Sequence, residues 1–305
     1  MSAKFEDLRQ SDEWGEYLHQ LHWLSEKLKI KNSKCKIFIR KIPFFGSVIK
    51  IQRPSEVPPI EDIDRIAKKH RALFVKLEPS FALRASEGLR PFDPDNWPLV
   101  PTRTIRIGLT PATDEIFARF SKDARYSIRR AERNGVEVRS LGLEAGNLKV
   151  FYDLLKETGK RKRFWVPPEA DLQAKAQAFK DKSMLLLAYH NRKPIAGALI
   201  LFHDQVAYYH QAASNLCGRK LLAPYLVVWE VIKLSKKRGC HTLDLEGIYD
   251  PRYPIYKRFK KIGIFKKKFG GKEIEYPGSF IRYYNPFVKL IFKVANQLDF
   301  VQLFK

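Results

Sequence analysis

A lysine near the C-terminus has the sequence context most suggestive of chemistry. Lys266 follows Phe265 and precedes Phe269, and a glycine pair at residues 270–271 comes next. An ammonium group held between aromatic rings sits in a low dielectric, where its charge acts more strongly than in water. The glycines can adopt φ > 0 or admit another group close to the backbone. Taken alone, the run also fits a solvent-exposed basic turn, which is the simpler interpretation.

Other catalytic constellations are not indicated by the sequence. Cys35, Cys217 and Cys240 are widely spaced, which is neither a disulfide framework nor a zinc pattern. His19 and His22 have no third ligand nearby in the sequence, and no Ser-His-Asp or Cys-His set is recognisable. We therefore expect neither a metal ion nor a cofactor. Asp244 and Glu246 end a predicted strand, where carboxylates can take a proton or bind an amine, although a structural role in the turn is the simpler explanation.

Basic side chains gather in three further places. Arg219 and Lys220 precede a helix predicted to begin at Leu221, whose N-terminus can attract phosphate, and solvation of the helix start explains them equally well. Arg125 and Arg129 follow helical spacing and either contact phosphates or face solvent. A third set mixes cations with aromatic rings, as in sites for single-stranded nucleic acid. Its members are Tyr256, Lys257, Arg258, Phe259, Lys260, Lys261, Lys267, Lys268 and Lys272.

The helix that carries Arg125 and Arg129 is the best defined in the sequence. Thr110 is a suitable N-cap, Pro111 is tolerated in the first turn, and the stop at residues 134–135 is Asn-Gly. Apolar residues at helical spacing form one stripe and basic residues form another. One face of this single helix, over residues 111–133, should therefore be core and the other a cationic ridge.

The remaining pattern alternates strands with helices. We expect helices at 12–29, 62–72, 147–159, 171–180 and 221–238, and strands at 35–40, 47–52, 73–77, 104–109, 184–189, 194–202, 205–213 and 241–245. This order predicts an α/β fold with mixed sheets and crossover connections. Near the C-terminus, a segment at 287–304 is amphipathic. Its apolar face should pack against the body of the protein rather than lie on a membrane surface. That face consists of Phe287, Leu290, Ile291, Val294, Leu298 and Val301.

Charge and hydropathy limit the functional classes. The 305 residues include 57 basic and 33 acidic ones, a formal net charge of +24, which indicates a polyanionic partner such as RNA, DNA, an anionic membrane or a diphosphate. The N-terminus lacks the apolar core of a signal peptide, and the apolar runs fall well short of the roughly 20 residues that a bilayer span needs. We expect a cytoplasmic protein, with peripheral contact at the inner membrane face left open.

Taken together, these segments resemble the FemABX family, the aminoacyl-tRNA-dependent peptidyltransferases of bacterial cell-wall synthesis. The similarity lies in the helix at 124–136, the start of a second domain at 151–164, the strand and helix at 208–214 and 222–230, and the closing motif at 244–248 and 265–271. Each motif is loose, but their order is specific.

The resemblance implies two acetyltransferase-like (GNAT) domains, one at 1–143 completed by 278–305 and the other at 144–277. The long helical hairpin that some members insert in the second domain is missing here, as in the compact members, and we expect a monomer. The resemblance also implies transfer of an amino acid from aminoacyl-tRNA to an amino group on the stem peptide of a peptidoglycan precursor, nucleotide-linked or lipid-linked. Besides the missing hairpin, two features depart from the family. No carboxylate follows the strand that ends at Gly108-Leu109, and no lysine follows Trp14 where some members bind the precursor phosphate.

An aminoacyl ester is already activated, so amine attack requires orientation and a stabiliser for the developing oxyanion. Within the resemblance, Lys266 is the expected cationic stabiliser, and Phe265 is expected to buttress it or stack on the terminal base of the tRNA. Two alternatives stay open. An acyl-CoA-dependent N-acyltransferase would use the same fold, but residues 215–220 lack the usual glycine-rich phosphate loop. A non-catalytic tRNA-binding or envelope-associated protein would bind without turnover.

Overall fold

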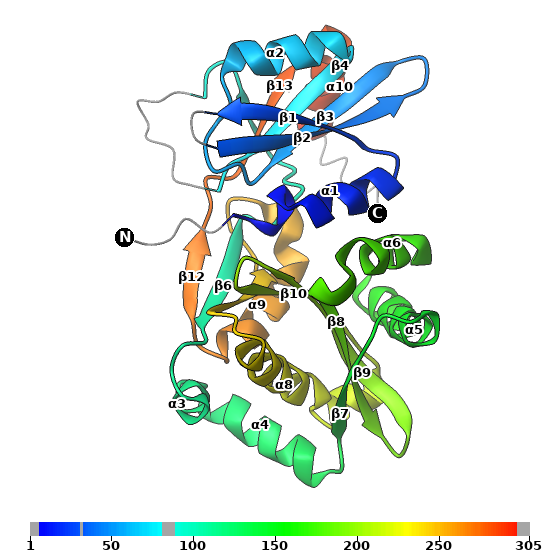
Figure 1. The fold of residues 1–305 in the computed structure, drawn as a ribbon, viewed down its shortest axis with the longest axis vertical. Helices are drawn as coiled ribbons and strands as arrows, with labels where there is room; N and C mark the ends of the chain where they lie inside the picture. The colour runs from blue at the N-terminus through cyan, green and yellow to red at the C-terminus, as the bar shows by residue number, and fades with distance from the viewer. Residues whose placement is uncertain (1–5, 31–32, 81–88, 298–305) are drawn as a thin grey trace. The chain divides into compact units, whose positions relative to one another are not determined.

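The computed structural model describes residues 6–30, 33–80 and 89–297. The chain divides into two compact units (Figure 1). Unit 1 comprises residues 1–102, 250–257 and 275–305, and unit 2 comprises residues 103–249 and 258–274. Each unit is built on one mixed sheet, so the α/β class expected from the sequence is confirmed.

Unit 1 is built on a six-stranded sheet in the order β1-β2-β3-β4-β13-β5. The strands are β1 (Leu24–Ile30), β2 (Ser33–Ile42), β3 (Gly46–Gln52), β4 (Ala72–Glu78), β5 (Asp93–Asp95) and β13 (Ser279–Tyr283). β3 and β4 are parallel, and α2 (Ile60–Lys69) is the helix of their crossover. Buried aliphatic side chains of α2 and the sheet form the core of this unit. The helical elements η1 (Leu8–Gln10), α1 (Asp12–Gln20) and α10 (Pro286–Gln297) complete it.

The helix expected at residues 12–29 is shorter than predicted. α1 ends at Gln20, and His22 has φ = 64°, which turns the chain out of the helix. Residues 24–30 instead form β1, which pairs antiparallel with β2. In β1 the side chains of Leu28 and Ile30 are buried while the residue between them is exposed. That alternation suits a strand with one face on the core.

Unit 2 is built on a seven-stranded sheet in the order β12-β6-β11-β10-β9-β8-β7. The strands are β6 (Arg103–Gly108), β7 (Glu137–Leu141), β8 (Ser183–His190), β9 (Lys193–His203), β10 (Val206–Ser214), β11 (Thr242–Gly247) and β12 (Lys272–Glu275). α4 (Lys122–Arg133) and α8 (Ala223–Lys237) pack on one face, and α5 (Ala145–Lys162) lies on the other beside α6 (Glu169–Phe179). The other helical elements of unit 2 are α3 (Thr113–Ala118), η2 (Lys180–Lys182), α7 (Leu216–Lys220) and α9 (Lys260–Lys267), while η3 (Pro254–Phe259) begins in unit 1 and ends in unit 2.

The boundary between the units differs from the one expected near residue 143. The family resemblance implies that residues 103–143 lie in the first domain, whereas in the structure they lie in unit 2. The cause is long-range strand pairing, because β6 is antiparallel to β11 and β7 is antiparallel to β8. The C-terminal segment from Glu275 onward lies in unit 1, where β13 is inserted between β4 and β5.

The single helix expected over residues 111–133 is two helices, α3 and α4. Ser121 interrupts it, because its side chain caps the backbone N–H of Ala124 at 3.2 Å while its own N–H donates to the carbonyl of Lys268 at 2.8 Å. The stripe prediction is confirmed for α4, where Ala124 and Ile128 are buried in the core. The capping chemistry of a serine therefore starts a new helix inside a helical pattern.

The outer face of α10 does not pack against the body of the protein as expected. Phe292 does pack, against the rings of Phe74, Trp97 and Tyr283. The predicted apolar stripe is exposed instead, at Phe287, Leu290, Ile291 and Val294. Leu298 and Val301, the other members of that stripe, lie outside the described residues. Among the described residues, no helix is long and apolar enough to span a membrane.

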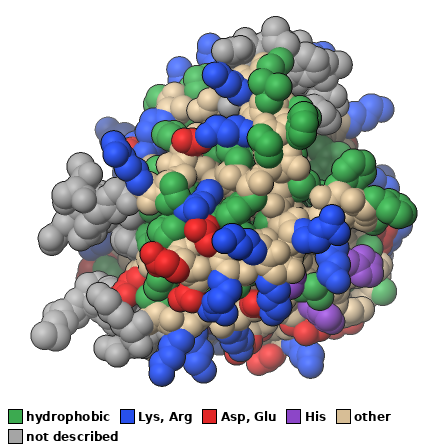
Figure 2. Space-filling view, turned by 90° about the horizontal axis from the view of Figure 1, so that it is seen from above, with side chains coloured by type: hydrophobic (Ala, Val, Ile, Leu, Met, Phe, Trp, Pro, Cys, Tyr) green, Lys and Arg blue, Asp and Glu red, His purple; other side chains and the backbone are tan. Residues whose placement is uncertain are grey.

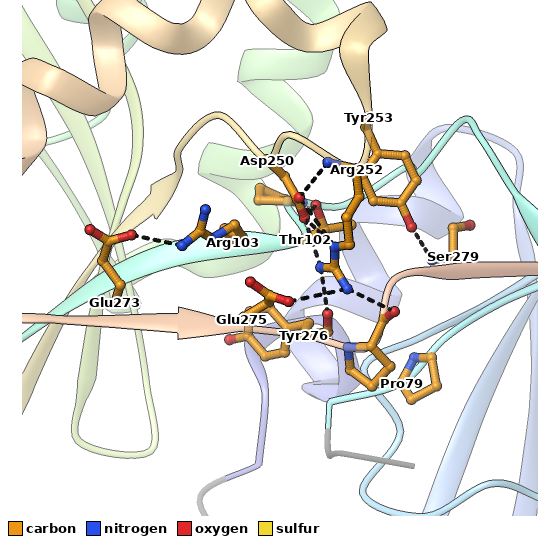
Figure 3. Close-up of polar contacts among 12 residues, drawn as sticks. Pro79, Thr102, Arg103, Asp250, Arg252, Tyr253, Glu273, Glu275, Tyr276 and Ser279 are labelled. Carbon is orange, nitrogen blue, oxygen red and sulfur yellow. Dashed lines mark hydrogen bonds and ion pairs between the residues drawn. The ribbon is translucent and has the colours of Figure 1, made fainter. Parts of the chain in front are cut away.

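A polar network in unit 1 joins three stretches of chain that are distant in sequence (Figure 3). The carboxylate of Asp250 accepts hydrogen bonds from the Thr102 hydroxyl at 2.7 Å and from the Arg252 guanidinium at 2.7 Å. Arg252 also donates to the carbonyl of Tyr276 at 2.8 Å. Burial would raise the pKa of Asp250, but the hydrogen bonds from Arg252 and Thr102 outweigh burial and lower it. The network fixes residues 102, 250–252 and 276 to one another.

Candidate active site

Lys266 lies in the last turn of α9 and is buried, with 8% of its surface exposed. Its Nζ donates a hydrogen bond to the carbonyl oxygen of Gly247, the last residue of β11, at 2.8 Å. Gly263, one turn earlier, allows α9 to approach the chain that follows β11, since a Cβ there would lie 3.4 Å from the Cβ of Ile248. The solvent-exposed basic turn is therefore excluded, because the lysine is held on a helix against a strand end.

The two phenylalanines do not enclose this ammonium group as the sequence suggested. Phe265 and Phe269 lie four residues apart on a helical path, which places them on one face together. Their rings pack at 5.2 Å on each other, and Phe265 contacts the ring of Tyr225 at 4.9 Å. Lys266 points to the end of β11 instead. Its low-dielectric surroundings come from the strand end and not from an aromatic pair.

The charge state of Lys266 is set by its unit 2 surroundings. Burial lowers its pKa, the carboxylates of Glu246 and Asp244 raise it, and Lys162 lowers it, for a net value of about 8. At neutral pH the group is still mainly an ammonium ion, so it can donate a hydrogen bond to an anion. Its proton is nevertheless held less tightly than that of an exposed lysine.

Asp244 serves the structure of β11. Its carboxylate accepts hydrogen bonds from the Thr104 hydroxyl, the backbone N–H of Glu246 at 2.8 Å and Nε of Arg106 at 3.0 Å. Burial raises its pKa and the neighbouring Glu246 raises it further, whereas Arg106 and Thr104 lower it. These contacts connect β6 to β11 directly beside the candidate site, as expected from the structural interpretation of this carboxylate.

Glu246 has an unusual backbone for its position. It lies where the pairing of β6 and β11 shifts register, and its φ of 60° is in the left-handed region that non-glycine residues rarely adopt. The Thr104 hydroxyl donates to its carbonyl oxygen at 3.0 Å, and the residue is 7% exposed. Strained residues of this kind cluster at functional sites. The charge of the Glu246 carboxylate raises the pKa of Lys266.

Arg161, Lys162 and Arg219 form a cluster of cations that act on one another electrostatically. Arg161, in the last turn of α5, donates to the carbonyl of Ser214 at 2.8 Å. The pKa of Arg161 is lowered by burial and, to a smaller extent, by the nearby charge of Arg219. The pKa of Lys162 is lowered by burial and then by the charges of Arg161 and Arg219. Lys162 in turn acts on Lys266. Like charges held this close favour an anionic ligand, because a phosphate would relieve their repulsion.

Sequence reasoning identified Arg219 in this cluster but missed Arg161 and Lys162. The basic run at residues 160–163 closing α5 was the available indication, and it resembles an ordinary basic helix end. Arg219 and Lys220 themselves lie on α7, not in a loop before a helix at Leu221. Asn215 caps α7 by accepting from the N–H of Gly218 at 2.8 Å, and the longer helix α8 begins only at residue 223.

Arg125 and Arg129 lie on α4, as predicted, and both already have contacts. Arg125 donates to the carbonyl of Ala118 at 2.9 Å, which caps the end of α3. The Arg129 guanidinium lies 5.4 Å from the ring centroid of Phe117. A hollow of about 690 Å³ runs along this helix. It is lined by Lys122, Arg125, Tyr126, Arg129, Glu132 and Arg133.

The predicted nucleic-acid patch is divided between the units. Tyr256 and Lys257 belong to unit 1, whereas the residues from 258 to 272 belong to unit 2. The Tyr256 hydroxyl donates to the carbonyl of Pro98 at 2.8 Å. Lys267 pairs with Glu273 at 2.6 Å and Lys268 with Asp123 at 3.1 Å. Phe259 ends η3 and Lys260 begins α9 next to it. The structure therefore gives several members of the set local partners.

The two units, each built on one mixed sheet, define an α/β fold, and Lys266 is buried at the end of β11 in unit 2. The model of the FemAB family matches this chain over residues 99–194 and 189–299, so the chain belongs to the FemAB family. It is accordingly an aminoacyltransferase of the family that forms peptidoglycan bridges, whose substrates are aminoacyl-tRNA and a peptidoglycan precursor. The resemblance drawn from the motifs is thereby confirmed.

Solved structures agree with the fold. A crystal structure of FemX is 18% identical, with a TM-score of 0.78, covering 95% of this chain and 96% of that one. The structure of L-PGS from Bacillus licheniformis is 12% identical, with a TM-score of 0.58, covering 90% of this chain and 88% of that one. The curated proteins include no match to this sequence. At such identities the structural likeness establishes the fold alone.

Proposed function

We propose that this enzyme transfers an amino acid from aminoacyl-tRNA to an amino group on the stem peptide of a peptidoglycan precursor, with Lys266 stabilising the oxyanion. The observation that carries the proposal is the buried ammonium group of Lys266, held by the Gly247 carbonyl beside Glu246. A pKa of about 8 leaves it charged at neutral pH. Within the described part of the chain, the Gly247 carbonyl is the hydrogen-bond acceptor of this ammonium group, whose three N–H groups leave others to offer to a developing oxyanion.

In the proposed reaction, the acceptor amine attacks the ester carbonyl carbon and a C–N bond forms. The carbonyl oxygen gains negative charge, and the Lys266 ammonium stabilises it. The tetrahedral intermediate then collapses, the bond from carbon to the ribose oxygen breaks, and the electron pair leaves with that oxygen. The proton lost by the amine is taken up by the leaving ribose oxygen, so the step is balanced without an external acid.

In this proposal, the cationic side chains bind phosphate groups of the two substrates. Arg161, Lys162 and Arg219 bind phosphate of the tRNA acceptor end or the diphosphate of the precursor, supported by their mutual proximity. Arg125, Arg129 and Lys220 are further phosphate contacts. Phe265 supports the site through its packing on Tyr225 or stacks on the terminal base. The remaining tRNA contacts are Tyr256, Lys257, Phe259, Lys260, Lys267 and Lys268.

We place the reaction in the cytoplasm, where charged tRNA is made, with the enzyme acting as a monomer that can touch the inner membrane face. The net charge of +24 supports binding of both polyanionic substrates. The acceptor is a precursor in nucleotide-linked or lipid-linked form.

A transfer assay tests this function directly. Purified protein is expected to move a radiolabelled amino acid from charged tRNA to a precursor and to form a hydrolysis-resistant amide. The assay should use a panel of charged tRNAs with both forms of precursor. Binding of tRNA without transfer to any acceptor in that panel would instead support the non-catalytic alternative and overturn the proposal.

Two substitutions should move the alkaline limb of the pH–rate profile in opposite directions. The wild-type rate is expected to fall above about pH 8 as Lys266 loses its proton. Glu246→Gln removes a charge that raises the Lys266 pKa, so the limb should move to lower pH. Lys162→Met removes a charge that lowers the Lys266 pKa, so the limb should move to higher pH. If both profiles shift in the same direction, or neither shifts, the alkaline limb does not report the deprotonation of Lys266.

A further inference from the structure

The β2–β3 hairpin presents two phenylalanines to solvent. Phe44 is 99% exposed and Phe45 is 73% exposed. The turn is fixed, since Phe44 has φ = 67° and the N–H of Phe45 donates to the carbonyl of Ile42 at 3.1 Å. Gly46, with φ = 125°, allows the loop between α2 and β4 to pass close to the hairpin, because a Cβ at residue 46 would lie 2.3 Å from the carbonyl oxygen of Arg71. A rigid turn thus holds two large apolar rings in water.

A second apolar surface lies on α10. Phe287, Leu290, Ile291 and Val294 follow the spacing i, i+3, i+4 and i+7, which places them on one helix face, and they are 42–75% exposed. Phe292, on a different face, attaches the helix to the unit 1 sheet through Phe74 and Tyr283. The exposed stripe is therefore held outward by a helix whose other side is packed.

The hairpin tip and the start of α10 lie at the same end of the unit 1 sheet. Ser47 of β3 pairs with Ala72 at the start of the parallel strand β4. β13 runs antiparallel to β4, with Tyr283 opposite Phe74 and the N–H of Tyr284 bonded to the carbonyl of Leu73 at 2.9 Å. With β4 between β3 and β13, two strand spacings of about 5 Å put the two features on the order of 10 Å apart.

Exposed cations surround these apolar groups. Arg40 and Lys41 precede the turn, Arg71 follows α2 at the same end, and Lys289 and Lys293 lie on α10. Two nearby carboxylates have other cationic partners, because Lys69 pairs with Glu26 at 2.7 Å and Arg282 pairs with Asp64 at 2.7 Å. Lys289 itself pairs with Asp93 at 3.0 Å, so Arg40, Lys41, Arg71 and Lys293 carry the positive charge of this surface. Figure 2 shows blue Lys and Arg side chains interspersed with exposed green hydrophobic ones on the face that it draws.

We propose that this end of unit 1 docks on an anionic lipid bilayer. Protruding aromatic rings and an amphipathic helix enter the headgroup boundary, while the surrounding cations meet lipid phosphates. The charge complementarity selects an anionic membrane over an uncharged apolar partner. This part of the inference rests on the proposed function. A docked enzyme and a lipid-linked precursor would lie on the same membrane surface, so the lipid-linked form would be the preferred acceptor.

The first test is sedimentation with vesicles of phosphatidylcholine alone and with added phosphatidylglycerol. Wild-type protein is expected to bind the anionic vesicles at least about tenfold more strongly. Phe44→Ser with Phe45→Ser, and separately Leu290→Ser with Ile291→Ser, should each reduce that binding about tenfold or more. Leu99→Ser is the matched control, because Leu99 is 54% exposed, is also in unit 1 and contacts Glu78 at the opposite end of β4. It should bind as wild type does.

Absent binding to anionic vesicles, or wild-type binding by both double variants, would overturn the proposal. A wild-type dimer in light scattering that the double variants abolish would also overturn it, by making a second copy the occupant of this surface. In the transfer assay, the variants should keep wild-type turnover with a soluble nucleotide-linked precursor and lose about tenfold with a lipid-linked precursor in vesicles. If vesicle binding is found without any transfer by the wild type, the docking surface stands and the proposed function fails.

Discussion

Lys266→Met is expected to lower kcat by about 100- to 1000-fold, the usual cost of removing one oxyanion donor. The physical reason is that a buried ammonium beside Glu246 is already oriented by the Gly247 carbonyl, so it needs no reorganisation when charge develops on the ester. Methionine keeps the length of the side chain and removes the charge. The affinity for charged tRNA should change little, because the bond to the oxyanion is made only in the transition state.

Lys175→Met is the matched control for this experiment. Lys175 is also buried in unit 2, on α6, where it pairs with Asp171, and burial lowers its pKa as it does for Lys266. Its replacement should reduce stability by breaking a buried ion pair and leave kcat unchanged. Wild-type turnover in Lys266→Met, or equal losses in both variants, would remove the proposed role of Lys266. Near-ultraviolet circular dichroism of both proteins establishes that they are folded.

Asp250→Ala is expected to lower the free energy of unfolding by about 2 kcal/mol. The substitution removes the acceptor of the Thr102 hydroxyl and of the Arg252 guanidinium, in the network that joins three stretches of unit 1 (Figure 3), although Arg252 keeps its ion pair with Glu275 at 3.4 Å. Because the folded-state pKa of Asp250 is lowered, its stabilisation is fully present above the unfolded value near 3.8. It is lost as the pH falls through the folded-state value.

Urea denaturation at neutral pH and at acid pH measures this effect. The difference in stability between wild type and Asp250→Ala should shrink toward acid pH. Asp153→Ala provides the comparison, since Asp153 also has two cationic partners, Lys149 and Lys156, but lies on an exposed helix surface. It should show no comparable loss at any pH. A loss for Asp250→Ala as small as that for Asp153→Ala would mean that the network does not hold these segments together.

The fold class and most element positions were predictable because the hydrophobic period of each segment agrees with its final structure. The errors arose where a local backbone event overrode the pattern. His22 leaves the helical region and ends α1, and the Ser121 cap divides one amphipathic pattern into α3 and α4. The domain boundary was missed because β6 pairs with β11, a contact between residues far apart in sequence that no local period encodes.

Lys266 was identified in the sequence from its aromatic neighbours, but the structure holds it by a different contact. The Gly247 carbonyl and the Glu246 carboxylate act on it from a strand end that is distinct from the phenylalanine face. Arg161 and Lys162 were missed since they come from a helix end elsewhere in the chain, and only folding brings their charges together. The exposed face of α10 was wrongly expected to pack, because an amphipathic pattern does not say which surface will cover it.

A tetrahedral analogue provides the most direct test of the central claim. A phosphonamidate joining the aminoacyl end of the tRNA to the acceptor amine mimics the oxyanion, and an amide-linked aminoacyl-tRNA mimics the ground state. Both affinities should be measured for the wild type and for Lys266→Met. We predict that the variant binds the phosphonamidate about 100- to 1000-fold more weakly and binds the amide-linked tRNA almost as well as the wild type. Equal changes in the two affinities would contradict transition-state stabilisation by Lys266.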